Sequence, residues 1–265
     1  MRRKMEYFVV CIVAVIVSGL TLFSGFGLGT VLMPAFALFF PIPVAVAATA
    51  LVHLANNLFK AALVGRKADW SVVMKFALPG AAAAMLGAML LSIFASLPPV
   101  SSYQLGGKTH EIGLVELVIG VLIVGFAFLD LLPRFERLAF DRKYLPVGGL
   151  LSGFFGGLSG IQGALRSAFL IKTGLGKEAF IGTSTISAVI VDMARLLVYG
   201  LSFYTATFAK IAPGMGGLIL TATLAAFIGS FIGSRLMKKV TLRTVQIIVG
   251  IMLIVVGGSL ASGLF

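Results

Sequence analysis

Apolar residues fill most of this chain in long runs, and polar residues are confined to short intervals between them. A helix needs roughly 20 apolar residues to cross the hydrocarbon core of a bilayer. Eight runs approach or exceed that length: residues 7–40, 44–64, 72–96, 112–132, 146–171, 178–200, 207–234 and 244–264. Glycines interrupt the runs 7–40 and 146–171, so the pattern predicts an all-α polytopic membrane protein of about 8–10 helices.

Composition supports this fold class. Charged residues make up 11% of the 265 positions, and 59% are hydrophobic, whereas a soluble domain carries about a quarter charged residues. The apolar runs leave no segment for a soluble domain, and we expect a multi-pass protein of the inner (plasma) membrane. Cys11 is the only cysteine, which excludes an intrachain disulfide.

The chain contains an internal duplication. Residues 18–70 align without a gap with a second copy 134 positions further on, so that Ser18 meets Ser152 and Thr49 meets Thr183. Internal repeats of this kind are common in secondary transporters. We therefore predict two homologous repeats of four apolar segments each, with the first segment of each repeat broken by glycines. The predicted divisions are residues 1–132 for the first repeat, 133–145 for a polar loop and 146–265 for the second repeat.

The loop charges favour a returning hairpin in the second repeat. The chain has a formal net charge of +12, and Lys and Arg normally collect in cytoplasmic loops. Eight simple crossings would divide these charges almost evenly between the two sides. If segment 146–171 instead returns to the side on which it starts, loops 172–177 and 235–243 become cytoplasmic. Lys108 is then the only external loop charge.

The same hairpin inverts the two halves. Loop 65–71 and its partner 199–205 then face opposite sides of the membrane, as in inverted-repeat transporters. If segment 7–40 also returns, the inversion is complete, but the basic residues at positions 2–4 lie outside. The charges therefore favour inversion and leave the course of the first segment open.

Each glycine-rich stretch is followed by a short apolar helix, at residues 30–40 and 164–171. The free N–H groups and the positive dipole end of such a helix suit an anion. Glycines also allow close packing of membrane helices, which is the structural alternative. Their matching positions in the two repeats favour a binding site.

Three stretches of sequence resemble a known family. Residues 24–34 (SGFGLGTVLMP) look like the glycine-rich, proline-terminated signature of the sulfite exporter TauE/SafE family. Residues 157–170 (GLSGIQGALRSAFL) and 177–183 (KEAFIGT) resemble the second copy of that signature. The resemblance covers essentially the whole chain. It implies a permease or exporter of small sulfur-containing anions such as sulfite or organosulfonates.

A polar stripe runs along the apolar span 44–64. Its members recur at three- and four-residue intervals, which places them on one helix face; they are Thr49, His53, Asn56, Asn57 and Lys60. The stripe can line a substrate path or join helices by hydrogen bonds, and we favour the path. Lys60 lies near the end of the span and fits a side chain that extends to the membrane surface.

The matching span of the second repeat begins a polar face with Thr183, Ser184 and Ser187. Asp192 and Arg195 follow, at the spacing of an intrahelical ion pair. Ionisable groups at membrane depth are costly and usually face the interior of the bundle. The two residues could form a structural ion pair or act as a gate or proton relay, and the sequence does not decide between these roles.

Arg166 is the leading candidate for the anion-binding residue. It lies in the first turn of the second short helix, where a cation is unfavourable unless an anion is also present. Its forked guanidinium suits an oxyanion. The alternative is an ion pair with Asp192. The predicted cradle adds neutral donors and free backbone N–H groups, supplied by Gln162, Ser167, Gly29, Thr30 and Gly163.

Other functional classes fit less well. Only Glu116, Asp130 and Asp192 could place a carboxylate in or beside the spans, which is too few for a buried catalytic or metal site. No phosphate-binding loop motif occurs, and basic residues do not alternate with aromatic ones as in nucleic-acid binding. We therefore expect a secondary transporter of small anions without cofactor or metal, and the sequence leaves open whether protons or sodium are the coupling ion. A carboxylate transporter and a non-transporting scaffold remain as alternatives.

Overall fold

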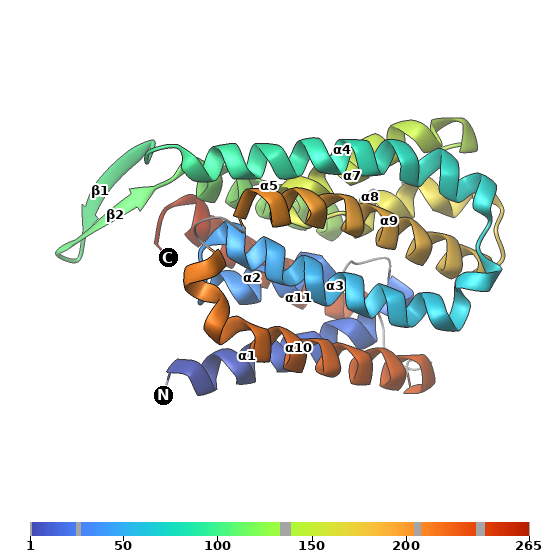
Figure 1. The fold of residues 1–265 in the computed structure, drawn as a ribbon, viewed down its shortest axis with the longest axis horizontal. Helices are drawn as coiled ribbons and strands as arrows, with labels where there is room; N and C mark the ends of the chain where they lie inside the picture. Colours follow the sequence, from blue (N-terminus) through green and yellow to red (C-terminus); the bar gives the residue numbers. More distant parts are fainter. Residues whose placement is uncertain (1, 25–27, 133–138, 204–207, 237–241, 265) are drawn as a thin grey trace.

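The computed structural model is a bundle of helices with a small protruding β-hairpin (Figure 1). It describes residues 2–24, 28–132, 139–203, 208–236 and 242–264. The first half contains α1 (Arg2–Ser24), α2 (Leu28–Ala37), α3 (Ile42–Val64), α4 (Trp70–Ser96) and α5 (Leu114–Leu131). The second half contains α7 (Leu145–Ser159), α8 (Gly163–Leu170), α9 (Lys177–Phe203), α10 (Phe208–Leu236) and α11 (Leu242–Ala261). Single 3-10 turns lie at Gly65–Lys67, Arg142–Tyr144 and Ile171–Thr173.

The outer surface is that of a membrane protein. Among the described residues, four helical stretches are long and apolar enough to span a bilayer: Ile42–Lys67, Trp70–Ser96, Lys177–Leu201 and Met215–Gly233. Large hydrophobic side chains such as Leu63, Leu197 and Leu201 are 64–81% exposed. Soluble monomers rarely expose apolar surface on this scale, so these side chains face lipid.

Glycines allow the helices to approach closely across the two halves. α4 packs along α7 and α1 packs along α10. A Cβ atom at Gly153 would collide with the backbone of Gly80, and one at Gly233 would collide with the backbone of Gly19. Such small residues let membrane helices come into backbone contact. α3 packs against α9 and α5 against α11, so every one of these contacts joins one half to the other.

The bundle has two distinct ends. At one end, which we call the basic end, the chain turns from α3 into α4. Lys67 Nζ lies 3.0 Å from Oε2 of Glu178 at the start of α9. Asp69 caps α4 by accepting from Val72 N and donates its own N–H to Thr183 Oγ1 at 2.9 Å. Phe203 is twenty residues further along α9, roughly 30 Å from Thr183. Loop 65–69 and the C-terminal end of α9 therefore lie at opposite ends of the bundle (Figure 1).

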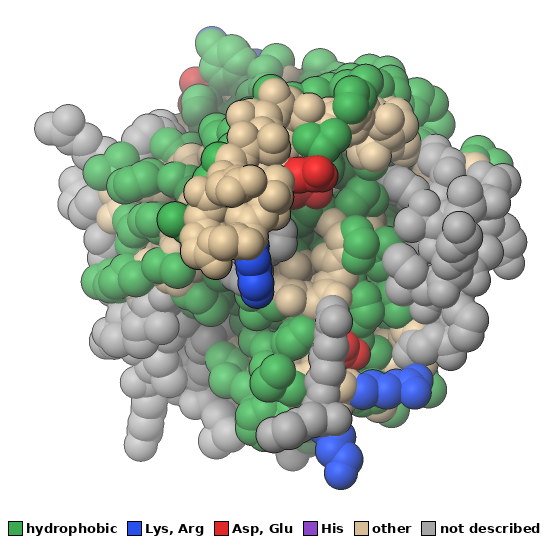
Figure 2. Space-filling model, turned by 90° about the vertical axis from the view of Figure 1, so that its left-hand side faces the viewer, with side chains coloured by type: hydrophobic (Ala, Val, Ile, Leu, Met, Phe, Trp, Pro, Cys, Tyr) green, Lys and Arg blue, Asp and Glu red, His purple; other side chains and the backbone are tan. Residues whose placement is uncertain are grey.

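The other end, which we call the hairpin end, carries the β-hairpin and both chain termini (Figure 1). Hydrophobic side chains surround this end in Figure 2, and few described charged side chains are seen there. Exposed Arg and Lys side chains are more numerous at the basic end, which fits a cytoplasmic position; they include Arg66, Lys67, Arg142, Lys143, Lys172 and Lys177.

Two pairs of helices turn back within the bundle. α7 ends at Ser159, and its C-cap Gly160 has a φ of +80°, a left-handed conformation that favours glycine. α8 then returns toward the basic end. Phe140 N donates to Ala168 O, so this segment begins and ends on the same side. α2 likewise runs opposite to α1 and leads back to the start of α3 (Figure 1). Gly25–Gly27, between α1 and α2, lie outside the described residues.

The expectation of an all-α chain requires one correction. Strands β1 (Ser101–Leu105) and β2 (Lys108–Ile112) pair antiparallel, with Leu105 opposite Lys108. Gly106 and Gly107 form the two-residue turn with φ of +61° and +77°, the conformation that such hairpins require. Tyr103 donates from its hydroxyl to Ser262 O, so the hairpin contacts the C-terminal segment.

The fold predicts which loops share a side of the membrane. With Cys11 replaced by alanine, single cysteines at Arg66 and Lys172 should react with an impermeant reagent from one side. A cysteine at Lys108 should react from the other. Labelling of intact and everted vesicles measures this. Reaction of Arg66→Cys and Lys172→Cys from opposite sides would contradict the arrangement, because simple crossings place these loops on different sides.

Candidate functional site

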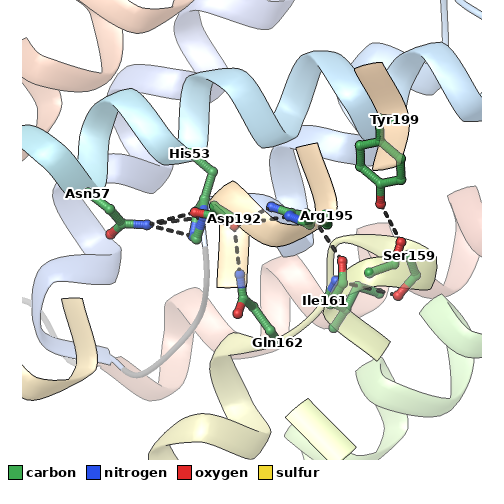
Figure 3. Close-up of polar contacts among 10 residues, drawn as sticks. His53, Asn57, Ser159, Ile161, Gln162, Asp192, Arg195 and Tyr199 are labelled. Atoms are coloured by element: carbon green, nitrogen blue, oxygen red, sulfur yellow. Dashed lines mark hydrogen bonds and ion pairs between the residues drawn. The ribbon is translucent and has the colours of Figure 1, made fainter. Parts of the chain in front are cut away.

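A fully buried carboxylate, Asp192 on α9, lies at the centre of the candidate site (Figure 3). Its Oδ2 accepts from Nδ1 of His53 at 2.6 Å and from Nδ2 of Asn57 at 3.4 Å. Its Oδ1 accepts from Nε2 of Gln162 at 3.0 Å and from Nη2 of Arg195 at 2.7 Å. Because a carboxylate only accepts, the proton of the His53 bond lies on Nδ1. Asp192 therefore connects α3, α9 and the turn before α8.

Arg195 extends this network to the end of α7. It donates from Nε to Asp192 Oδ1 at 3.0 Å and from Nη1 to Gly156 O at 2.9 Å. One turn further along α9, the Tyr199 hydroxyl donates to Gly157 O (Figure 3). Gly157 O belongs to the last α7 turn, whose carbonyls helical bonding leaves free, whereas Gly156 O accepts from both Arg195 and the Gly160 N–H. α9 thus fixes the place at which α7 ends and the chain turns into α8.

The two glycine-rich segments meet at this turn. A Cβ atom at Gly29, in the first turn of α2, would lie 2.6 Å from Gly160 O and 3.8 Å from Thr49 Cγ2. Only a residue without a side chain fits there. α8 starts at Gly163 with Gln162 as its N-cap, and no side chain caps it. The first N–H groups of a helix have no partner within the helix, so the start of α8 offers free donors next to the start of α2.

Arg166 is buried and only partly satisfied. Its Nε donates to Ser184 Oγ on α9 at 2.9 Å, while its Nη1 has no hydrogen-bond partner. Asp192 attracts Arg166 electrostatically, but within the described chain no ion pair under 4.0 Å joins them. The direct Arg166–Asp192 pair that the sequence left as an alternative is therefore not formed. Arg166 keeps part of its guanidinium free.

Several residues that were predicted to bind substrate carry buried polar atoms without a hydrogen-bond partner. In the described part of the chain, five buried side-chain atoms lack a hydrogen-bond partner: Thr49 Oγ1, Asn56 Nδ2, Gln162 Oε1, Arg166 Nη1 and Ser187 Oγ. Buried polar groups are almost always bonded, so each exception requires an explanation. All five belong to residues that the sequence singled out for a substrate. A bound polar ligand would satisfy such atoms.

A comparison with protein-family models matches residues 7–260 to the model described as sulfite exporter TauE/SafE. The chain belongs to the sulfite exporter TauE/SafE family. Searches of curated proteins and of solved structures found no match. Members of this family are transporters rather than enzymes, and the protein is accordingly a multi-pass membrane permease or exporter.

Other predicted residues of this TauE/SafE protein have structural partners. Asn56 accepts on Oδ1 from Ser230 Oγ at 2.8 Å, and Ser18 Oγ lies 2.6 Å from Ser230 Oγ, which joins α3, α1 and α10. Thr183 accepts from Asp69 N at the basic end. It is nine residues, roughly 13 Å, from Asp192 along α9. The structure therefore gives Thr183 a loop-holding role and does not bring it to the Asp192 network.

The remaining members of the predicted cradle differ in burial. Thr30 and Gly163 are buried at the starts of α2 and α8, whereas Ser167 is half-buried. Tyr199 was missed by sequence reasoning, although its position one turn beyond Arg195 was a usable signal. Lys60 differs from expectation, because it is 8% exposed rather than extended to the surface.

The Asp192 network predicts a large loss of stability when its carboxylate is removed. Asp192→Asn leaves the buried Arg195 without a counter-charge, and breaking a buried pair costs about 3–5 kcal/mol. The melting temperature of purified protein should fall by several degrees, and Asp192→Asn/Arg195→Gln should recover part of the loss. Asp141→Asn, at an exposed carboxylate, is the matched control. A melting temperature for Asp192→Asn equal to that of the control would show that the network does not stabilise the fold.

Proposed function

We propose that this protein is a secondary transporter of small sulfur-containing oxyanions, such as sulfite or organosulfonates, in the inner (plasma) membrane. The observation that carries the proposal is the free Nη1 of buried Arg166, one turn inside an uncapped helix. An arginine beside free N–H groups is electrostatically unfavourable until an anion joins them. The family description, sulfite exporter, supports the sulfur-containing class.

The proposed anion lies against Arg166 at the start of α8. The guanidinium supplies a charged fork, which suits the oxygens of a sulfur oxyanion. Ser187 Oγ and the N–H groups near Gly163 add neutral donors, and those near Gly29 and Thr30 reach the same turn from α2. Gln162 donates from Nε2 to Asp192, and its unpartnered Oε1 is an amide oxygen, which can only accept and does not bind an anion. We therefore assign Gln162 chiefly to holding Asp192.

The proposal includes an inverted repeat, with residues 1–132 and 146–265 as the two units. Two packing relations support it. α1 packs along α10 and α4 along α7, which is the exchange expected when the first helix of each unit pairs with the fourth helix of the other. Loop 65–69 and Phe203 lie at opposite ends of α9, as inversion requires. In transporters of this kind the substrate binds between the repeats near the membrane midplane.

Arg166 should dominate anion affinity. Arg166→Gln removes charge-assisted hydrogen bonds worth about 1.5–3 kcal/mol each, so binding of sulfite should weaken roughly 10–100-fold. Arg166→Lys should recover only part of the affinity, because a point charge does not reproduce the fork. Calorimetry on purified protein and uptake into proteoliposomes measure both effects.

Arg66→Gln, at an exposed arginine of the basic end, is the matched control and should bind like the wild type. Undiminished sulfite binding by Arg166→Gln would remove the proposed site. Binding of carboxylates in preference to every sulfur anion would reject the substrate class and leave an anion transporter of another kind.

A further inference from the structure

The buried charges of the described bundle do not balance. Three cationic side chains are at most 8% exposed, namely Lys60, Arg166 and Arg195, against one buried carboxylate, Asp192. The charge of Asp192 compensates that of Arg195, which donates two hydrogen bonds to it. Among the side chains whose burial the structure describes, the two positive charges of Lys60 and Arg166 are therefore left in excess. Buried charge without a counter-charge is strongly unfavourable.

Lys60 and Arg166 belong to one electrostatic group. They lie on different helices, α3 and α8, at a similar level of the bundle. α3 follows α9 from His53, which contacts Asp192, to Val64, whose carbonyl lies beside Gly182. Lys60 is therefore level with the part of α9 at which Ser184 accepts from Arg166. Within the described residues Lys60 has no hydrogen bond and no acidic side chain within 4.0 Å. Asn57, one turn before Lys60 on α3, reaches Asp192. The same face of α3 therefore runs from the Asp192 network to Lys60.

We infer that Lys60 is a second substrate-binding cation and that the preferred substrate is a small oxyanion with two negative charges. This inference rests on the proposed function and names the substrate class of the same site. A dianion between Lys60 and Arg166 neutralises both excess charges, whereas a monoanion leaves one buried and uncompensated. Lys60 thus sets the selectivity for substrate charge, and the planar guanidinium of Arg166 supplies hydrogen-bond donors in a fixed direction.

Extension of Lys60 to the membrane surface is the competing explanation, and exposure argues against it. Lys67, seven residues further along and at the basic end, has a side chain 63% exposed. Lys60 is 8% exposed although it is only four residues from the end of α3 at Val64. A lysine that extends along the helix to the surface keeps its ammonium group in water.

Sulfate and methanesulfonate provide the test, because they are similar in shape and differ by one charge. Calorimetric titration of purified wild-type protein should give sulfate roughly tenfold or greater preference over methanesulfonate. Lys60→Gln should weaken sulfate binding by roughly tenfold and change methanesulfonate binding by less than about threefold, so the preference should largely disappear. Lys60→Arg should keep it.

Lys172→Gln, at an exposed lysine, is the matched control and should leave the preference unchanged. Equal affinity of the wild type for the two anions overturns the inference, as does an unchanged preference in Lys60→Gln. If Lys60→Gln does not yield folded protein, the wild-type ratio and Lys60→Arg decide. If the wild type binds no sulfur anion, the proposed function itself is rejected. If it binds sulfate and methanesulfonate equally, only the inference about Lys60 is rejected.

Discussion

A carboxylate can stay ionised inside a helical membrane bundle only when donors and opposite charges surround it, and this constraint shapes the centre of the protein around Asp192. The residue is completely buried, and its two oxygens accept from α3, from α9 itself and from the turn before α8. Two of these donors come from elements other than α9, so their bonds join α3 and the turn before α8 to it. The Asp192 network therefore fixes the turn at which the two glycine-rich segments meet.

The same network leaves Arg166 without a direct carboxylate partner. Because Arg195 and His53 occupy Asp192, the carboxylate is not available as a direct partner for Arg166. The glycines act at the same place, since only a residue without a side chain allows α2 to approach Gly160. The starts of two helices and a partly free guanidinium thus lie in buried positions, where electrostatic interactions are stronger than in water.

The sequence could predict features that depend on local spacing. The three-residue interval of Asp192 and Arg195 predicted their pairing, and their side chains are 2.7 Å apart. The apolar runs predicted the helices with ends within a few residues. Contacts between distant segments could not be predicted in this way, because spacing carries no information about which helix faces which. His53 and Asp192 are 139 positions apart, and Thr183 proved to face Asp69. The β-hairpin was not predicted, although Gly106-Gly107 is a typical turn pair, because the prediction of an all-α chain rested on the long apolar runs and the hairpin lies between two of them.

We propose that a sulfur oxyanion binds against Arg166 where the two short helices begin. Crystals grown with selenite, a heavier analogue of sulfite, test it through the anomalous scattering of selenium. We expect a selenium peak within the buried site, with a selenite oxygen within hydrogen-bonding distance of Arg166 Nη1. Selenite density confined to exposed lysines of the basic end, with none beside Arg166, would contradict it.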